Sequence, residues 1–140
     1  MISNGQKSRL VQEAVLALQN PYPKDSSHVY AAAVLTDRGN TYAASNYHSD
    51  THSLTLHAEQ SALAHAAAHG EGSIVAIAVT SNEKLESGQF TPPCHMCKQL
   101  LWESRLRSSR PMLVILANSH GETKEVDLDK LMPLPWPPQP

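Results

Sequence analysis

The chain has 140 residues, of which 41% are hydrophobic and 17% charged, and its formal net charge is −2 at pH 7. A chain of this length is expected to form one domain, residues 1–140, and to bury roughly 68–70% of its unfolded surface without disulfide bonds. The small net charge provides no general attraction to nucleic acids or anionic membranes, so neither is an expected partner. No apolar run has the length of a signal-peptide core at the N-terminus or of a membrane span elsewhere, and we expect a cytoplasmic protein.

The first third of the chain predicts one helix and one β-hairpin. Apolar residues recur at helical spacing over residues 5–19, and Asn20 with Pro21 closes that stretch. Residues 29–35 and 41–45 are short β-prone segments on either side of a polar tetrapeptide, 37–40, whose residues favour a tight turn. We therefore expect an antiparallel pair of strands after the first helix.

The remainder alternates helices and strands. Residues 56–69 are rich in alanine and precede Gly70, which predicts a helix ending at a glycine. The other predicted elements are strands at 74–79 and 112–116, a helix at 94–106, an edge strand at 122–126, and a proline-rich tail at 133–140 that forms neither helix nor central strand. This order predicts an α/β protein with three α/β/α layers around a mixed five-stranded sheet.

Two short motifs place metal-binding side chains at helix starts. His57-Ala58-Glu59 lies in the first turn of the helix at 56–69, and Pro93-Cys94-His95-Met96-Cys97 begins the helix at 94–106. Cys94 and Cys97 are three residues apart, so both side chains occupy one helix face. With His57 they fill three corners of a Zn²⁺ tetrahedron and leave the fourth open to water, as a catalytic zinc requires. A His-x-Glu followed by Pro-Cys-x-x-Cys is the pattern of zinc deaminases.

Glu59 is the predicted proton carrier of this site. It stands two residues after His57 and points to a different side of the helix, which makes it a poor zinc ligand. One carboxylate within hydrogen-bond reach of the reacting water can act as general base and then as general acid. Glu59 is therefore expected to move a proton from water to a substrate ring nitrogen and then to the departing amine.

Other interpretations of these residues stay open. A lone Cys-x-x-Cys also occurs in redox proteins, although that motif needs no distant His-Ala-Glu. A purely structural zinc needs a fourth protein ligand, for which His95 is the candidate; on a helix it is rotated by about 100° from Cys94. We expect His95 at the surface or the pocket rim, and His65 and His69 as ordinary residues of a helix face.

These motifs resemble those of the cytidine deaminase family. His57-Ala58-Glu59-Gln60-Ser61-Ala62 is similar to the form in the dimeric, longer enzymes, whereas the short tetrameric enzymes usually carry Cys-Ala-Glu-Arg. One neutral histidine and two thiolates balance the charge of Zn²⁺. A neutral glutamine at position 60, in place of the arginine of the short enzymes, is consistent with this ligand set. Tyr30-Ala31-Ala32-Ala33-Val34-Leu35 is similar to the family's Val-Gly-Ala-Ala-Leu-Leu strand.

The resemblance also implies a set of substrate-binding residues. Asn46, eleven residues before His57, matches the asparagine that binds the ribose in short family members. His48 and His28 stand where the family has a ribose-binding glutamate and a pocket phenylalanine. The backbone N–H of Ala58 and the backbone carbonyl of Pro92 match groups that bind the pyrimidine carbonyl and the amine.

The C-terminal segment and the assembly follow from the same resemblance. Trp136 corresponds to an aromatic residue that packs near a neighbouring subunit's pocket in the tetrameric enzymes, although a tail tryptophan packed on its own domain is an equal alternative. The resemblance and the chain length imply a homotetramer with one Zn²⁺ per subunit.

The expected activity is zinc-dependent hydrolytic deamination of cytidine, deoxycytidine or a close analogue, giving the uridine product and ammonia. His48 and His28 leave open a modified sugar, a free base, a phosphate or a C4- or N4-substituted cytidine. An aminonucleoside antibiotic such as blasticidin S ranks lower, because the lead-in 53–56 lacks the glycine and proline of those deaminases. Nucleic-acid editing needs a basic, aromatic channel that this composition does not favour, and a non-catalytic binding protein would not need the complete catalytic set.

Overall fold

A computed structural model describes residues 2–140 of the chain, and within them five strands form one sheet. The strand order is β2-β1-β3-β4-β5, with β3 and β4 parallel and the other neighbouring strands antiparallel. The strands are β1 (Tyr30–Thr36), β2 (Thr41–Ser45), β3 (Ile74–Ser81), β4 (Leu113–Ala117) and β5 (Thr123–Asp127). The sheet is mixed and five-stranded, as the sequence predicts.

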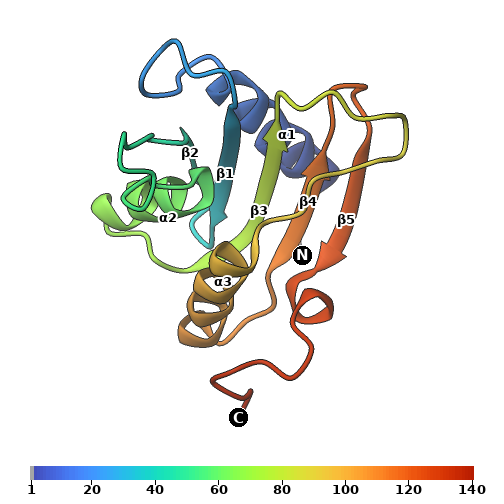
Figure 1. The fold of residues 1–140 in the computed structure, drawn as a ribbon. Coiled ribbons are helices and arrows are strands. Elements are labelled where there is room, and N and C mark those ends of the chain that lie inside the picture. The colour runs from blue at the N-terminus through green and yellow to red at the C-terminus, as the bar shows by residue number, and fades with distance from the viewer. Residues whose placement is uncertain (1) are drawn as a thin grey trace.

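Helices cover both faces of this sheet (Figure 1). Helix α1 (Asn4–Ala17) packs on one face, and α2 (Ala58–Ala68) and α3 (His95–Ser108) pack on the other. Along β1, Ala33 and Leu35 pack in the cluster with α1, whereas Ala32 and Val34 pack in the cluster with α2 and α3. This alternation is the two-residue period of a strand buried on both faces, and it confirms the predicted α/β/α layers.

The observed elements differ from the predicted ones mainly at their ends. Helix α2 begins at Ala58, so His57 is its N-cap residue and not a residue of its first turn. The Gln60 side chain explains this start, because its Oε1 accepts the His57 backbone N–H at 2.7 Å. Cys94 is likewise the N-cap of α3, and β3 continues two residues further than predicted. A short 3₁₀ helix, η1 (Leu128–Leu131), was not predicted.

The proline-rich tail forms neither helix nor strand, as expected, and its backbone is bound to α3. Gln99 Nε2 donates to the carbonyl of Trp136 at 2.8 Å, and the buried Trp102 donates through Nε1 to the carbonyl of Pro137 at 2.8 Å. The Trp136 side chain itself is 74% exposed. Within residues 2–140, no helix combines the length and apolar character needed to cross a membrane.

Helix α1 lies on the face opposite the two metal motifs, so its packing can be tested apart from the site. Leu10 is completely buried among residues of β1, β3 and β4. We predict that Leu10→Ala lowers the free energy of unfolding by about 2–5 kcal/mol, because the substitution removes buried methyl groups and leaves a cavity. Leu16→Ala, at a position 57% exposed on the same helix, should change it by less than about 0.5 kcal/mol.

Urea denaturation of both variants checks this prediction. Equal destabilisation by the two substitutions would contradict the packing of α1 on the sheet.

Candidate active site

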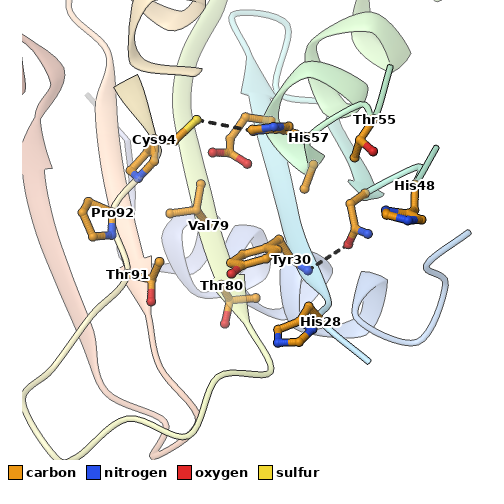
Figure 2. A pocket seen from close by; sticks show the side chains of 14 residues that line it. His28, Tyr30, His48, Thr55, His57, Val79, Thr80, Thr91, Pro92 and Cys94 are labelled. Carbon is orange, nitrogen blue, oxygen red and sulfur yellow. Dashed lines mark hydrogen bonds between the residues drawn. The ribbon is translucent and has the colours of Figure 1, made fainter. Parts of the chain in front are cut away.

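The N-termini of α2 and α3 bring three metal-binding side chains together. His57 Nδ1 lies 3.3 Å from Cys94 Sγ and 3.4 Å from Cys97 Sγ. These three donor atoms all lie within 4.8 Å of one another. Figure 2 shows the His57 ring and the Cys94 side chain facing each other across the upper end of a pocket. The two segments, 37 residues apart in sequence, thus form one cluster.

The donor set fits zinc. Tetrahedral ligation with Zn–N near 2.0–2.1 Å and Zn–S near 2.3 Å separates nitrogen from sulfur by about 3.6 Å, close to the separations seen here. Burial, with the nearby Glu59 carboxylate and Cys94, raises the pKa of the Cys97 thiol. A cation between the sulfur atoms reverses this effect by stabilising the thiolate, and the positive ends of two helices act in the same direction. His95 is exposed and does not belong to the cluster.

Glu59 lies in the first turn of α2, directly after Ala58, and is only 8% exposed. It lines the same pocket as His57 and Cys94. Its carboxylate is near enough to Cys97 to raise the pKa of that thiol. The acid is therefore placed beside the donor cluster without belonging to the three-atom group, as expected for a proton carrier.

The pocket next to this cluster has a volume of about 380 Å³. That size is in the usual range for small-molecule sites. Five residues predicted to bind substrate line it, namely His28, Asn46, His48, Ala58 and Pro92. Trp136 does not line it. A contact of Trp136 with a neighbouring subunit's pocket stays a prediction.

Asn46 is oriented by the start of β1. Its Oδ1 accepts the Tyr30 backbone N–H at 2.9 Å, and its own backbone N–H donates to the Tyr30 carbonyl at 3.2 Å. Because the amide oxygen is engaged in this way, the NH₂ group is the part of the side chain left to donate to a ligand. Asn46 therefore suits a substrate group that accepts a hydrogen bond.

Two histidines, His28 and His48, line the part of the pocket away from the donor cluster. The His48 ring packs edge-on against His52, with ring centroids 5.2 Å apart. His28 is exposed, and its Nδ1 lies 3.1 Å from the hydroxyl of Ser27. Figure 2 shows His48 beside Thr55 and His28 at the end remote from Cys94. Both residues thus line the pocket, where their imidazole rings can form hydrogen bonds.

Several pocket residues were not predicted from the sequence. Tyr30, Thr55, Val79, Thr80 and Thr91 also line the cavity. The signal for Tyr30 is its position two residues after His28, since alternate residues of an extended strand share one face. Thr91 comes from the loop before Cys94, whose path cannot be read from local sequence preferences.

The Glu122 carboxylate is one of the groups that anchor the loop before α3. Glu122 accepts hydrogen bonds from the Gly88 backbone N–H at 2.9 Å, from the Ser87 hydroxyl at 2.8 Å and from the Asn118 amide at 2.8 Å. These bonds, the one from Gly88 foremost, lower the pKa of Glu122 to about 2. The same loop continues to Pro92 and Cys94, so its anchoring supports the pocket wall.

The sequence and fold of this chain are similar to those of known proteins. Residues 4–110 match the family described as the cytidine and deoxycytidylate deaminase zinc-binding region. A cytidine deaminase of Halalkalibacterium halodurans is 30% identical over 127 residues, which cover 91% of each chain. The crystal structure of cytidine deaminase from Burkholderia pseudomallei has 26% identity and a TM-score of 0.80, covering 96% of this chain and 100% of that one. The Mycobacterium tuberculosis enzyme has 25% identity and a TM-score of 0.74, covering 93% and 96%.

The fold and the donor cluster therefore define a zinc-dependent hydrolytic deaminase. The chain belongs to the cytidine and deoxycytidylate deaminase family.

The anchoring of the loop by Glu122 predicts a dependence of stability on pH. Because its pKa is lowered in the folded state from an ordinary 4.5 to about 2, its contribution is fully present above about pH 4.5 and is lost as the pH falls toward 2. Glu122→Gln should therefore destabilise the protein at pH 6 and much less at pH 2.5. Urea midpoints at the two pH values measure this difference.

The exposed Glu86 lies in the same loop, and Glu86→Gln is the matched control. If Glu122→Gln and Glu86→Gln give the same pH profile, Glu122 does not anchor the loop.

Proposed function

We propose that this chain catalyses the hydrolytic deamination of cytidine or deoxycytidine, with release of ammonia. The observation that carries the proposal is the buried Glu59 beside a complete His57-Cys94-Cys97 donor set, at the inner end of a cavity of nucleoside size. The three donors would hold one zinc ion per subunit. When bound, the ion supplies a Lewis acid that makes water a competent nucleophile at neutral pH.

The protein groups divide the remaining chemistry among themselves. Glu59 accepts the proton of the attacking water and delivers it to the pyrimidine ring nitrogen. Glu59 then takes the second proton of that water, now on the hydroxyl added to the ring carbon, and passes it to the amine, so that the C–N bond breaks, ammonia leaves and a carbonyl remains. The Ala58 backbone N–H donates to the pyrimidine carbonyl, and the Pro92 carbonyl accepts from the amine. Asn46 and His48 hold the sugar, with the Asn46 NH₂ group as a donor to a hydroxyl oxygen.

The charges around the pocket favour a nucleoside over a nucleotide. Among the described residues that line it there is no lysine or arginine, and Glu59 contributes a carboxylate. A second carboxylate, Glu83, is hydrogen-bonded to the lining residues Tyr30 and Thr91. A negatively charged phosphate group in this pocket would be repelled by these two carboxylates, and no lysine or arginine among the described lining residues offsets that repulsion.

A C4- or N4-substituted cytidine is the second candidate substrate. The exposed His28 stands where the family has a phenyl ring, at the end of the pocket remote from Cys94. The reaction balance is the same, except that a substituted amine replaces ammonia as the leaving group.

A homotetramer is the proposed assembly. A groove between α2 and α3 is lined by apolar and polar residues; the apolar ones include Leu63, Ala64, Ala67 and Leu100, and the polar ones are Gln60, Ser104 and Arg107. Met96 on α3 and Trp136 in the tail are 61% and 74% exposed. Apolar surface of this kind suits contact with another copy of the chain.

Two free cysteines that serve as metal ligands suit a reducing compartment, which supports a cytoplasmic location. We also infer that residues 1–140 form one domain.

Glu59→Ala tests the proton-transfer assignment. We expect kcat for cytidine to fall by about 10²- to 10⁴-fold, because Glu59 is the one carboxylate among the described residues that line the pocket. Zinc content, measured by mass spectrometry of the metal, should stay unchanged, since Glu59 is not in the donor set. Glu86→Ala, at an exposed position, is the control and should retain full activity. Retained turnover in Glu59→Ala would contradict the assignment.

A comparison of cytidine with cytidine monophosphate tests the charge argument. We expect kcat/KM to be about tenfold lower or more for the monophosphate, because Glu59 and the adjacent Glu83 are acidic and no lysine or arginine is among the described lining residues. Ammonia release is the measurement for both substrates, with cytosine and N4-methylcytidine added to the panel. Faster turnover of the monophosphate would contradict the nucleoside proposal.

A further inference from the structure

Tyr30 supplies the phenyl-type ring of the pocket wall. Among the described lining residues, it is the one phenylalanine, tyrosine or tryptophan. Figure 2 shows its ring beside Val79 in the middle of the cavity wall, between the end with His57 and Cys94 and the end with His28. The ring is therefore placed where a flat substrate entering toward the metal centre passes.

The ring is held in place by a carboxylate from another part of the chain. The Tyr30 hydroxyl donates to Glu83 Oε1 at 2.6 Å, and the Thr91 hydroxyl donates to Glu83 Oε2 at 3.0 Å. The hydrogen bond to Glu83, followed by burial, raises the pKa of Tyr30 to about 12. The phenol is therefore neutral at physiological pH, and both oxygens of Glu83 have a hydroxyl donor.

The backbone of Tyr30 connects the ring with the predicted sugar-binding residue. Its N–H is bonded to Asn46 Oδ1 and its carbonyl to the Asn46 N–H. A shift of Tyr30 would therefore also move the Asn46 amide. The positions of the Tyr30 ring and the Asn46 amide are therefore linked. Glu83 binds the Tyr30 hydroxyl, and Asn46 binds the Tyr30 backbone at the start of β1.

We propose that Tyr30 is the stacking surface for the pyrimidine nucleoside, and that Glu83 and Thr91 are positioning residues that fix its ring. The proposal rests on the proposed nucleoside deaminase function and adds a specificity residue to it. Stacking of a base on an aromatic side chain is worth enough to decide affinity, about tenfold to hundredfold when the ring is removed. Since the interaction is present in the bound ground state, it acts on binding and KM more than on kcat.

The test measures the Kd of cytidine for the zinc-loaded chain carrying Glu59→Ala, so that binding is observed without turnover. Tyr30→Phe and Tyr30→Leu are compared in that background, because both lack the hydroxyl and are similar in size but only phenylalanine keeps an aromatic face. We expect Tyr30→Leu to raise Kd about tenfold to hundredfold and Tyr30→Phe to raise it only a few-fold. Tyr47→Ala, which removes an exposed tyrosine stacked on Tyr22, is the control and should leave Kd unchanged.

Folding is checked for each variant by zinc content and by the thermal midpoint. If Tyr30→Leu does not fold, Tyr30→Met, which also lacks an aromatic face, takes its place. Equal Kd values for the phenylalanine and aliphatic variants would overturn the stacking role alone. Absence of cytidine binding with Tyr30 intact would contradict the proposed function itself, so the two failures are distinguishable.

Glu83→Gln tests the positioning role with a readout that stacking does not determine. The ¹³Cζ resonance of Tyr30, assigned by its absence from Tyr30→Phe, should show no titration up to pH 10.5 in the unsubstituted chain. In Glu83→Gln it should begin to titrate near pH 10, and the Kd of cytidine should rise a few-fold. An unchanged titration in Glu83→Gln would show that Glu83 does not hold the ring.

Discussion

The meeting of two helix starts is the constraint on which the rest of the structure depends. His57 and Cys94 are the N-cap residues of α2 and α3, and their donor atoms lie 3.3 Å apart. Such proximity requires both helices to begin at the same edge of the sheet and to cover the same face (Figure 1). The parallel pair β3 and β4, with α3 as its crossover, provides this geometry. The positive ends of both helices then point at the thiolate ligands and favour their ionised form.

The metal end and the opposite end of the pocket differ in burial. The metal end is held by caps and by burial: Gln60 bonds the His57 backbone, and Cys97 is completely buried. At the other end, His28 is exposed and His48 packs against His52 on a loop. Reaction chemistry requires fixed geometry, whereas substrate choice can change with single residues at the rim. The buried metal end therefore defines the class of reaction, whereas the exposed residues at the opposite end influence which substrate is accepted.

Much of the fold was predictable, because strong local patterns agree with tertiary packing. The apolar run forms the buried strand β3, the alanine-rich stretch forms helix α2, and the two β-prone segments pair as the hairpin β1–β2. The donor set was predictable since each ligand lies in a short motif. The helix starts were displaced by one or two residues, because the Gln60 side chain, not the histidine itself, caps α2.

The pocket wall was less predictable, for physical reasons. Tyr30, Glu83 and Thr91 are brought together by pairing of β1 with β3 and by the loop after β3, which local sequence does not determine. The Glu122 anchor of that loop likewise joins residues more than 30 positions apart. The predicted packing of Trp136 near a neighbouring subunit's pocket follows from the family resemblance alone. A contact between subunits depends on the assembly and is not determined by the fold of one chain.

Titration of zinc into the metal-free chain, with ammonia release from cytidine as the readout, tests the central claim most directly. The rate should rise in proportion to bound zinc and stop rising at one zinc ion per chain. A chain that binds one zinc ion at the His57-Cys94-Cys97 cluster but releases no amine from cytidine, deoxycytidine or N4-substituted cytidines would contradict the proposed function. Equal activity of the metal-free chain would contradict it as well.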